Sequence, residues 1–175
     1  MLYTKRNILD TSFFNRPTLA VAEELLGKYL VRNSNGEERD FQITAVEAYL
    51  DEKDQASQAR FGKTKRNKIM FEKGGSFYVY LIYGIHQMLN ITTDESGKPG
   101  AILIRSVSDI QGPGRVAKAL NVNKKLHEKE AAPHTGLWFE DWSTHIPKEN
   151  IQKTPRIGID YAGEWKEKPY RFVLH

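Results

Sequence analysis

The 175-residue sequence contains no cysteine, which excludes disulfide bonds and thiolate metal sites. A chain without cysteine fits a reducing compartment, and we expect a cytoplasmic protein. No apolar run approaches membrane-spanning length, and residues 1–10 hold no apolar signal-peptide core, so we expect no membrane partner. The five histidines show no metal-ligand spacing, and no Walker A, GxGxxG or GxSxG pattern occurs.

What the chain does contain is the composition of a folded protein. Apolar residues make up 39% of the chain and charged residues 27%, which is typical of a soluble globular protein. The length predicts one domain, residues 1–175, with room for a sizeable core. A formal net charge of +4 permits an anionic partner without requiring one.

Hydrophobic periodicity and turn residues predict several strands and two short helices. The predicted helices are 17–26 and 115–120, and the predicted strands are 28–32, 40–50, 101–107, 155–159 and 170–174. The first two strands flank the turn signal Asn-Ser-Asn-Gly at 33–36. Residues 1–16 are expected to be irregular, with Phe13 and Phe14 as a hydrophobic anchor. No structure is assigned to residues 121–154.

A stretch without any charged side chain, Gly74–Thr93, is predicted to form a hairpin. Two β-rich runs flank Tyr83-Gly84, which fits the central positions of a type II turn in which glycine supplies the positive φ. Tyr83 would then stand at the hairpin tip. A large exposed ring is a poor core residue there, and it suits a wedge between base pairs.

Two further tyrosines, Tyr78 and Tyr80, share one face of the first strand of this hairpin. Aromatic rows on strands are usually core or cross-strand packing. Such rings also stack on nucleobases, at roughly 1–3 kcal/mol per base. A neutral aromatic hairpin beside basic residues and an isolated carboxylate is what a base-handling enzyme would need.

The isolated carboxylate is Glu47. Alternation along a strand predicts that Ile43, Ala45, Glu47 and Tyr49 share one face. Glu47 is then either a solvated glutamate on an exposed edge or a carboxylate placed in a partly buried site. In the second interpretation it is a general base, tuned by partial desolvation, that activates a water.

Arg105 is the natural companion of Glu47, because it shares a strand face with Ala101 and Leu103. It is either an arginine that reaches solvent at a sheet edge or a cation that orients Glu47 or the attacking water. Asn90 likewise interrupts an apolar run, and its amide either shapes a pocket or satisfies backbone groups.

A basic segment precedes the hairpin, with six basic residues and one acidic residue between Arg60 and Lys73. Residues 61–75 are expected to form a surface loop with a helical turn near 68–72. Charge runs are usually solvated loops, but beside an aromatic hairpin phosphate contact is the better account. The candidate phosphate contacts are Lys63, Lys65, Arg66 and Lys68.

Taken together and in this order, several segments resemble the alkyladenine (3-methyladenine) DNA glycosylase family. They are Val46–Leu50, Arg66-Asn67 with Met70-Phe71, Tyr78–Gly84 (YVYLIYG), Asn90-Ile91, Leu103–Arg105, Gly112–Gly114, Arg156–Ile159 and Ala162–Trp165. The resemblance extends from about Phe13 to Phe172. The YVYLIYG segment with an upstream EAYL is highly specific, whereas any one piece alone is weak.

The resemblance implies a compact single-domain α+β fold, with a mixed, mostly antiparallel curved sheet, flanking helices and a protruding DNA-inserting hairpin. It implies a monofunctional base-excision enzyme that flips a damaged purine out of double-stranded DNA and hydrolyses its N-glycosidic bond. It implies no metal or nucleotide cofactor. We expect a monomer.

By match to the family motifs, Glu47 would be the general base for the attacking water. Arg105 would hold that water, and the backbone around Ile157 would complete its site. No feature of the sequence demands a covalent lysine mechanism.

The same match implies roles for the aromatic residues. Tyr49 and Tyr80 would sandwich the flipped base, and Tyr78 would line the pocket. Asn90 would lie at the pocket floor. Tyr83 would fill the gap that the flipped nucleotide leaves.

One position departs from the family pattern. Eleven residues after the glutamate, where the family usually carries a histidine that hydrogen-bonds the base, this chain has Gln58. Glutamine has a donor and an acceptor but cannot become a cation near neutral pH. Phe61 stands where a glycine is common, and both changes bear on substrate range.

Two rival functions stay open at this point. The first is a nucleic-acid binding module that keeps the aromatic pocket but has lost turnover through Gln58 and Phe61. The second is a hydrolase of free nucleosides that never meets duplex DNA. Glu47 and Arg105 argue against the first rival, and the basic loop and Tyr83 argue against the second.

Overall fold

The structure is a computed structural model that describes residues 5–175. Its ten strands form one sheet, and every pairing between them is antiparallel. The strands are β1 (Asn7–Ile8), β2 (Tyr29–Ser34), β3 (Glu37–Tyr49), β4 (Phe77–Ile82), β5 (His86–Thr92), β6 (Ala101–Val107), β7 (Ile110–Gln111), β8 (Leu137–Asp141), β9 (Ile151–Thr154) and β10 (Arg171–Leu174). The predicted single-domain α+β fold with a mostly antiparallel sheet is confirmed.

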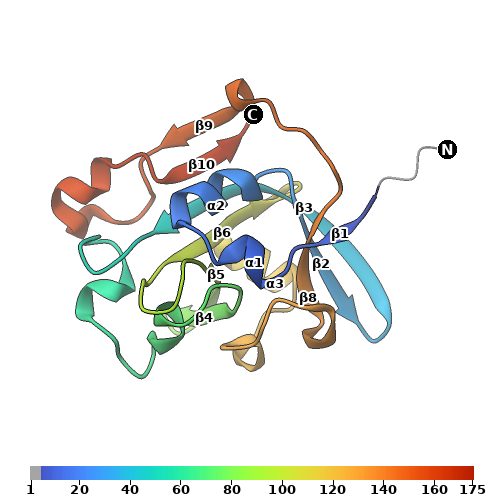
Figure 1. Ribbon diagram of the computed structural model, residues 1–175, viewed down its shortest axis with the longest axis horizontal. Coiled ribbons are helices and arrows are strands. Elements are labelled where there is room, and N and C mark those ends of the chain that lie inside the picture. The colour runs from blue at the N-terminus through green and yellow to red at the C-terminus, as the bar shows by residue number, and fades with distance from the viewer. Residues whose placement is uncertain (1–4) are drawn as a thin grey trace.

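The helices are short and lie around this sheet (Figure 1). The α-helices are α1 (Thr11–Phe14), α2 (Thr18–Leu25) and α3 (Pro113–Ala119). The 3₁₀-helices are Gln58–Phe61, Lys68–Phe71, Lys124–Leu126, Pro133–Thr135, Lys148–Asn150 and Asp160–Glu167. Helix α2 packs against β3, and α3 packs against β5 and β6. No helix within residues 5–175 is long and apolar enough to cross a membrane.

Strand β3 is the centre of the sheet, whose main path runs β1-β8-β2-β3-β6-β5-β4. Its first half pairs with β2, and its second half pairs with β6 on one side and β10 on the other. Within the pairing of β3 with β6, the register shifts on both sides of Ala45, which marks a bulge there. Because β3 pairs with β2, β6 and β10, a residue near its end meets segments from distant parts of the chain.

Because of the bulge, the alternation of side chains along β3 differs from the predicted one. Ile43 does not share a face with Glu47, since it lies in the hydrophobic core with Val46 and Ala48. An extra residue in one strand reverses the phase of alternation beyond it. The predicted phase holds for Glu47 and Tyr49, which lie on the side opposite Val46 and Ala48.

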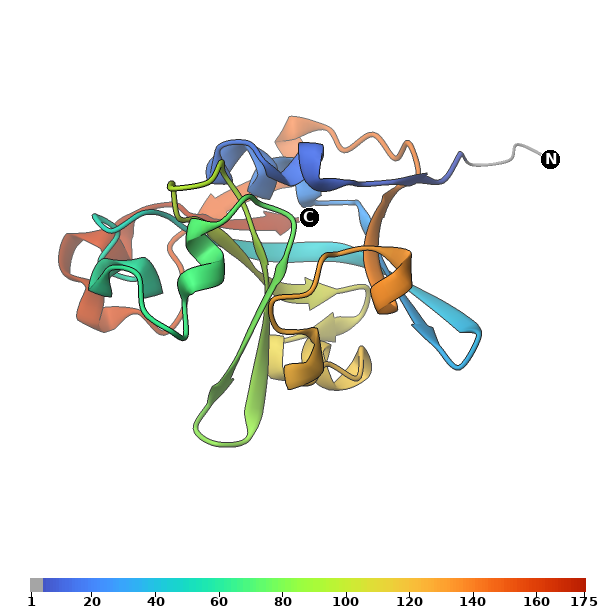
Figure 2. The same cartoon turned by 60° about the horizontal axis from the view of Figure 1, so that its bottom comes forward.

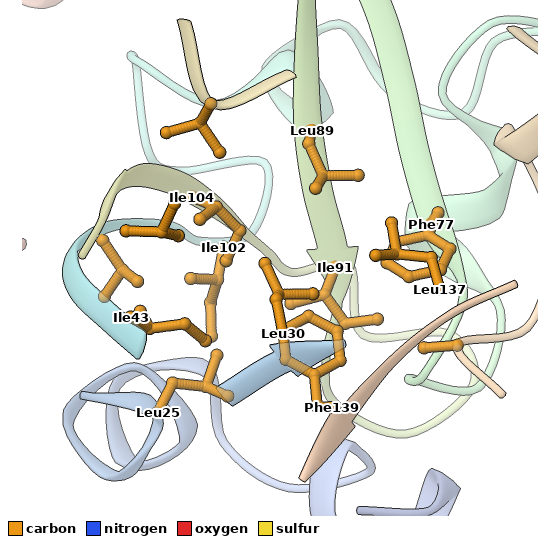
Figure 3. Close-up of a cluster of buried hydrophobic side chains, with 14 of the residues drawn as sticks. Leu25, Leu30, Ile43, Phe77, Leu89, Ile91, Ile102, Ile104, Leu137 and Phe139 are labelled. Atoms are coloured by element: carbon orange, nitrogen blue, oxygen red, sulfur yellow. The ribbon is translucent and has the colours of Figure 1, made fainter. Parts of the chain in front are cut away.

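The predicted helix near residues 17–26 is confirmed as α2. Its apolar face buries Val21, Ala22 and Leu25 completely. The chain leaves the helix at Gly27, whose φ of 82° is costly for any residue with a side chain. Figure 3 shows Leu25 pointing into the core beside Ile43, the first buried residue of the second half of β3.

Both predicted hairpins form, and one turn differs in type. Asn35 and Gly36 connect β2 to β3 with φ values of 55° and 87°. At the tip of the β4–β5 hairpin, Tyr83 and Gly84 have φ values of 52° and 70°. Positive φ at both central residues indicates a type I′ turn, so the predicted type II turn is wrong. A type I′ turn matches the twist of paired strands, and this hairpin projects from the body of the molecule in Figure 2.

Local sequence signals failed to predict the first helix. Residues 11–14, expected to be irregular, form α1, which Asp10 caps by accepting a hydrogen bond from Ser12 N at 2.9 Å. Phe14 is fully buried, as expected of an anchor. Residues 1–4, which begin the stretch predicted to be irregular and to hold no signal-peptide core, lie outside the described residues.

The strand predicted at 155–159 is also wrong. Strand β9 ends at Thr154, and the segment that follows is irregular. Pro155 has no backbone N–H for a sheet ladder, which favours an end at this point. Tyr170–Leu174 was predicted as a strand and is confirmed as β10.

The sheet separates two environments. One face carries the main core, in which side chains from α2, β2, β3, β4, β5, β6 and β8 meet (Figure 3). The core-facing residues of β4, β5 and β6 alternate with residues that point the other way. That opposite face borders a cavity.

Candidate active site

The cavity has a volume of about 480 Å³ and lies against β3, β4, β5 and β6. Ligand sites typically enclose about 300–1,000 Å³. Its lining includes Tyr49, Gln58, Arg66, Tyr78, Tyr80, Tyr83, Asn90, Arg105, Ile157 and Tyr161. Most of the residues that the sequence singled out therefore border one space, although they come from positions far apart in the chain.

Glu47 lies at the end of β3 and is completely buried. Arg105 Nη1 approaches its Oε1 at 3.1 Å, and Ile157 N donates to the same oxygen at 3.4 Å. Tyr49 OH donates to Oε2 at 3.0 Å. The alternative of a solvated strand glutamate is wrong. The alternative of a solvent-reaching Arg105 at a sheet edge is not supported either, because only 17% of its side chain is exposed.

Burial sets the protonation of this carboxyl. Removal from water raises the pKa of Glu47 above its ordinary value, and the charge of Arg105 and the hydrogen bonds from Tyr49 and Ile157 oppose that rise. A carboxylate with a raised pKa is a stronger base than an ordinary glutamate, provided that it is ionised at the working pH.

Glu47 reaches the cavity through its partners. Tyr49, Arg105 and Ile157 all border the cavity and all contact the Glu47 carboxyl. The carboxyl itself lies directly behind them. A small molecule at the cavity floor between Arg105 and the N–H of Ile157 would be next to Oε1.

The tyrosines form one wall of the cavity. Tyr78 and Tyr80 share a strand face as predicted, with ring centroids 5.1 Å apart. The Arg66 guanidinium lies 5.2 Å from the Tyr80 centroid. Burial raises the pKa of Tyr49, Tyr78 and Tyr80, so all three stay neutral phenols. The wall therefore offers flat, uncharged surfaces.

Asn90 lies in β5 opposite Tyr78 and is 2% exposed. Its Nδ2 donates to the carbonyl of Tyr78 at 3.1 Å and to that of Met88 at 3.4 Å. The side chain thus satisfies backbone carbonyl groups and also borders the cavity. Asn90 therefore fits both of the interpretations given from the sequence, a pocket residue and a partner of the backbone. Gln58 begins the 3₁₀-helix Gln58–Phe61 and borders the cavity as well.

The hairpin tip is exposed. Tyr83 is 90% exposed and Ile85 is 73% exposed. Tyr83 also borders the cavity mouth, so a strand of nucleic acid at the mouth would meet its ring. The predicted tip position of Tyr83 is observed, and its role in DNA stays a prediction.

The four predicted phosphate contacts are all exposed. Lys63 pairs with Glu72 at 3.0 Å, and Lys68 lies 3.5 Å from Glu128. Exposed pairs of this kind contribute little to stability and exchange readily with other anions. The segment is a surface loop with a 3₁₀-helix at Lys68–Phe71, as predicted.

Sequence reasoning missed Tyr161 and Asp54 near the cavity, and it gave no contacts for Arg60 or Arg156. Tyr161 is 60% exposed at the cavity edge, and the Arg60 guanidinium lies 5.0 Å from its ring centroid. Asp54 and Arg156 form a fully buried ion pair behind Tyr49. Asp54 lies in a polar stretch without periodicity, so the sequence held no signal for it. Within residues 5–175, no group of three or more histidine, aspartate or glutamate residues is placed to hold a metal ion.

Comparison with known proteins gives a consistent result. A family model described as Methylpurine-DNA glycosylase matches residues 12–112 and 108–175. Similar proteins named "Putative 3-methyladenine DNA glycosylase" occur in Myxococcus xanthus (40% identity, 94% of this chain and 89% of the relative), Legionella pneumophila strain Corby (40%, 95% and 93%) and Methanocella arvoryzae (37%, 94% and 91%). The predicted resemblance is confirmed: the chain belongs to the methylpurine-DNA glycosylase family, a family of DNA glycosylases.

Proposed function

We propose that this chain is a monofunctional base-excision enzyme that flips an alkylated or deaminated purine out of duplex DNA and hydrolyses its N-glycosidic bond. The observation that carries the proposal is the ion pair between buried Glu47 and Arg105, which borders a cavity walled by neutral tyrosines. We take the whole chain as one glycosylase domain that acts as a monomer on DNA in the cytoplasm.

This geometry supports the following proposed reaction. A water between Arg105, the N–H of Ile157 and Glu47 Oε1 gives a proton to Glu47 as its oxygen bonds to C1′ of the sugar. The C1′–N bond breaks, and the purine leaves with the bonding electrons. Positive charge develops at the sugar in the transition state, as in glycoside hydrolysis. The anionic Glu47 stabilises that charge while it accepts the proton.

The tyrosine wall favours electron-poor bases. Alkylation at a ring nitrogen makes a purine cationic, which improves both its stacking on Tyr49 and Tyr80 and its ability to leave. Flipping costs a few kcal/mol of stacking and pairing, and least where the base is damaged or mispaired. Damage is therefore selected once during flipping and again inside the cavity.

The test is base release from duplex oligonucleotides that contain one 3-methyladenine analogue, 7-methylguanine, hypoxanthine or ethenoadenine. We expect release from at least one of them, with an intact abasic strand as the other product. Tight binding of all four without any release would support a binding module instead. Release from free nucleosides but not from duplexes would support a nucleoside hydrolase.

Tyr83→Ala is expected to weaken binding to a lesion-containing duplex by about tenfold or more, because the ring no longer fills the vacated stack. Excision from a single strand should change little, since no stack has to be filled there. The measurement is duplex affinity by fluorescence anisotropy beside single-strand excision rates. Tyr83→Phe is the control that keeps the ring. Equal losses on both substrates would contradict the wedge role.

Gln58→His is expected to broaden the range of bases released, because histidine offers both an acceptor and a cationic donor to the base edge. The change is measured as the ratio of excision rates on hypoxanthine and 7-methylguanine duplexes at two pH values. Gln55→His, on the same loop but outside the cavity lining, is the matched control. An unchanged ratio would remove Gln58 from base recognition.

A further inference from the structure

A second fully buried charged site lies near the cavity, and the proposed mechanism does not use it. The side chains of Asp54 and Arg156 are both fully buried. They form two parallel hydrogen bonds, Nη1 to Oδ2 at 2.7 Å and Nη2 to Oδ1 at 2.8 Å. Nη1 also donates to the carbonyl of Ala48 at 2.9 Å. Lysine cannot reproduce this planar fork.

The pair joins three segments around Glu47. The Asp54 carboxylate accepts hydrogen bonds from Leu50 N at 2.9 Å and Ala56 N at 3.0 Å, which fixes the loop that leads to Gln58. Arg156 holds the end of β3 through Ala48. Arg156 itself opens the irregular segment that carries Ile157. Each of the three segments supplies part of the cavity wall.

The guanidinium also stacks on rings. It lies 4.8 Å from the centroid of Tyr49 and 5.3 Å from that of Tyr170. Tyr49 borders the cavity, whereas Arg156 is buried and does not border it. The guanidinium therefore covers the face of Tyr49 that is turned away from the cavity, and it fixes the plane of a ring that the flipped base would stack on.

Two of the three contacts of Glu47 depend on this arrangement. The hydroxyl of Tyr49 donates to one carboxyl oxygen, and the N–H of Ile157, the next residue after Arg156, donates to the other. A buried ion pair is a poor device for stability alone, because apolar residues of similar size often serve as well.

We propose that Arg156, held by Asp54, is a positioning residue that aligns Tyr49 and the Ile157 N–H on the Glu47 carboxyl. This inference rests on the proposed function of Glu47. In this role the buried pair does not touch the substrate. It orients the ring of Tyr49, on which the base would stack, and the two hydrogen bonds that Glu47 accepts.

The inference predicts a distinctive pH effect. Burial raises the pKa of Glu47, and the charge of Arg105, the hydrogen bonds from Tyr49 and Ile157 and the charge of Arg171 oppose that rise. Loosening the two hydrogen bonds, with both charges kept, therefore raises the pKa further. Because Glu47 acts as the ionised base, a higher pKa moves the acidic limb of the excision rate to higher pH. A role in folding alone would lower the melting temperature without moving this limb.

The experiment compares Arg156→Lys with the wild type in single-turnover excision from pH 5 to 9. We expect a loss of rate of up to about a hundredfold, since small misplacements of reacting groups have effects of this size. We also expect the acidic limb at higher pH, and a loss of duplex affinity smaller than the loss of rate, because the ring of Tyr49 is kept and only its alignment changes. The double variant Asp54→Asn with Arg156→Gln removes both buried charges together. If Arg156→Lys folds poorly, this double variant serves as the test, and we expect the same shift of the acidic limb.

The matched control is Arg6→Lys. Arg6 also makes a bidentate pair, with Glu140, and lies 5.0 Å from the ring centroid of Trp142, but neither it nor its partners border the cavity. Its rate and pH profile should equal those of the wild type. Should Arg156→Lys and the double variant also equal the wild type, the inference is wrong.

A readout without substrate separates this inference from the proposed function. Carbon NMR of glutamate-labelled protein, with Glu47→Gln for assignment, gives the titration of the Glu47 carboxyl directly. An upward shift in Arg156→Lys supports the positioning role even if the wild type releases no base. No shift, in a wild type that does release base, overturns the inference and leaves the proposed function intact.

Discussion

Replacing Glu47 with glutamine is expected to slow base excision by about 10²–10⁴-fold, the usual contribution of a general base. Glutamine has nearly the same shape but cannot accept the proton of the attacking water. Affinity for a lesion-containing duplex should stay within a few-fold, because Glu47 lies behind the cavity wall and its loss removes no contact with the base. The measurement is single-turnover excision beside duplex affinity.

The same substitution has a predicted effect on stability. Burial raises the pKa of Glu47 in the folded protein above its ordinary value. The folded state therefore binds the proton more tightly than the unfolded chain, and stability falls as the pH rises through this interval. Ionised Glu47 thus lowers the free energy of unfolding near neutrality. Glu47→Gln should melt at a temperature no lower than the wild type at pH 7.

Glu140→Gln is the matched control for Glu47. Glu140 is also a buried strand glutamate, and it accepts hydrogen bonds from Arg6, Trp138 and Trp142. Burial alone would raise its pKa, but these hydrogen bonds outweigh burial and lower it. Glu140→Gln should therefore lose stability at pH 7 and keep its excision rate. Full activity in Glu47→Gln would remove Glu47 from the mechanism.

Tyr80→Ala is expected to reduce excision and lesion affinity by roughly five- to 150-fold, which corresponds to the 1–3 kcal/mol of one base–aromatic stack. The loss should be larger for a cationic base such as 7-methylguanine than for neutral hypoxanthine, because only the cation gains from the ring quadrupole. Competition between the two duplexes in one reaction measures this ratio directly.

Two variants separate stacking from general packing at Tyr80. Tyr80→Phe keeps the ring and should keep most of the activity. Tyr29→Ala removes a half-buried strand tyrosine that stacks on Trp142 at 3.9 Å outside the cavity, and it should affect stability alone. Equal losses of excision in Tyr29→Ala and Tyr80→Ala would show that the effect comes from folding and not from base binding.

The sequence predicted those features of the site that depend on residues close together in the chain, and it missed those that depend on residues far apart. Period-two alternation placed Tyr78 with Tyr80 and Arg105 with Leu103, because these relations are local to one strand. It misplaced Ile43, since a bulge resets the alternation and leaves no mark in composition. Gly84 indicated a turn correctly, but the turn type depends on the twist of the paired strands.

The pair of Asp54 and Arg156 lay beyond such reasoning altogether. Its members are 102 positions apart. Asp54 looks like an ordinary surface residue in its local sequence, and Arg156 lies in a segment that resembles the family without any local signal for the role of its side chain. Burial of both side chains results from tertiary packing of the end of β3 against two segments that have little regular secondary structure. The strand predicted at 155–159 failed for the same reason, because that segment is shaped by these contacts and not by a sheet ladder.

The β2–β3 and β4–β5 turns solve one backbone problem with different residues. Asn35-Gly36 has the composition that a type I′ turn prefers, whereas Tyr83 holds a conformation that costs an ordinary L-residue about 1–2 kcal/mol. A protein engineer who ranked positions by backbone preference would choose Tyr83 among the first to replace. Such a stabilised chain would lose the ring proposed to enter DNA, so thermostability alone is a poor criterion for improving this enzyme.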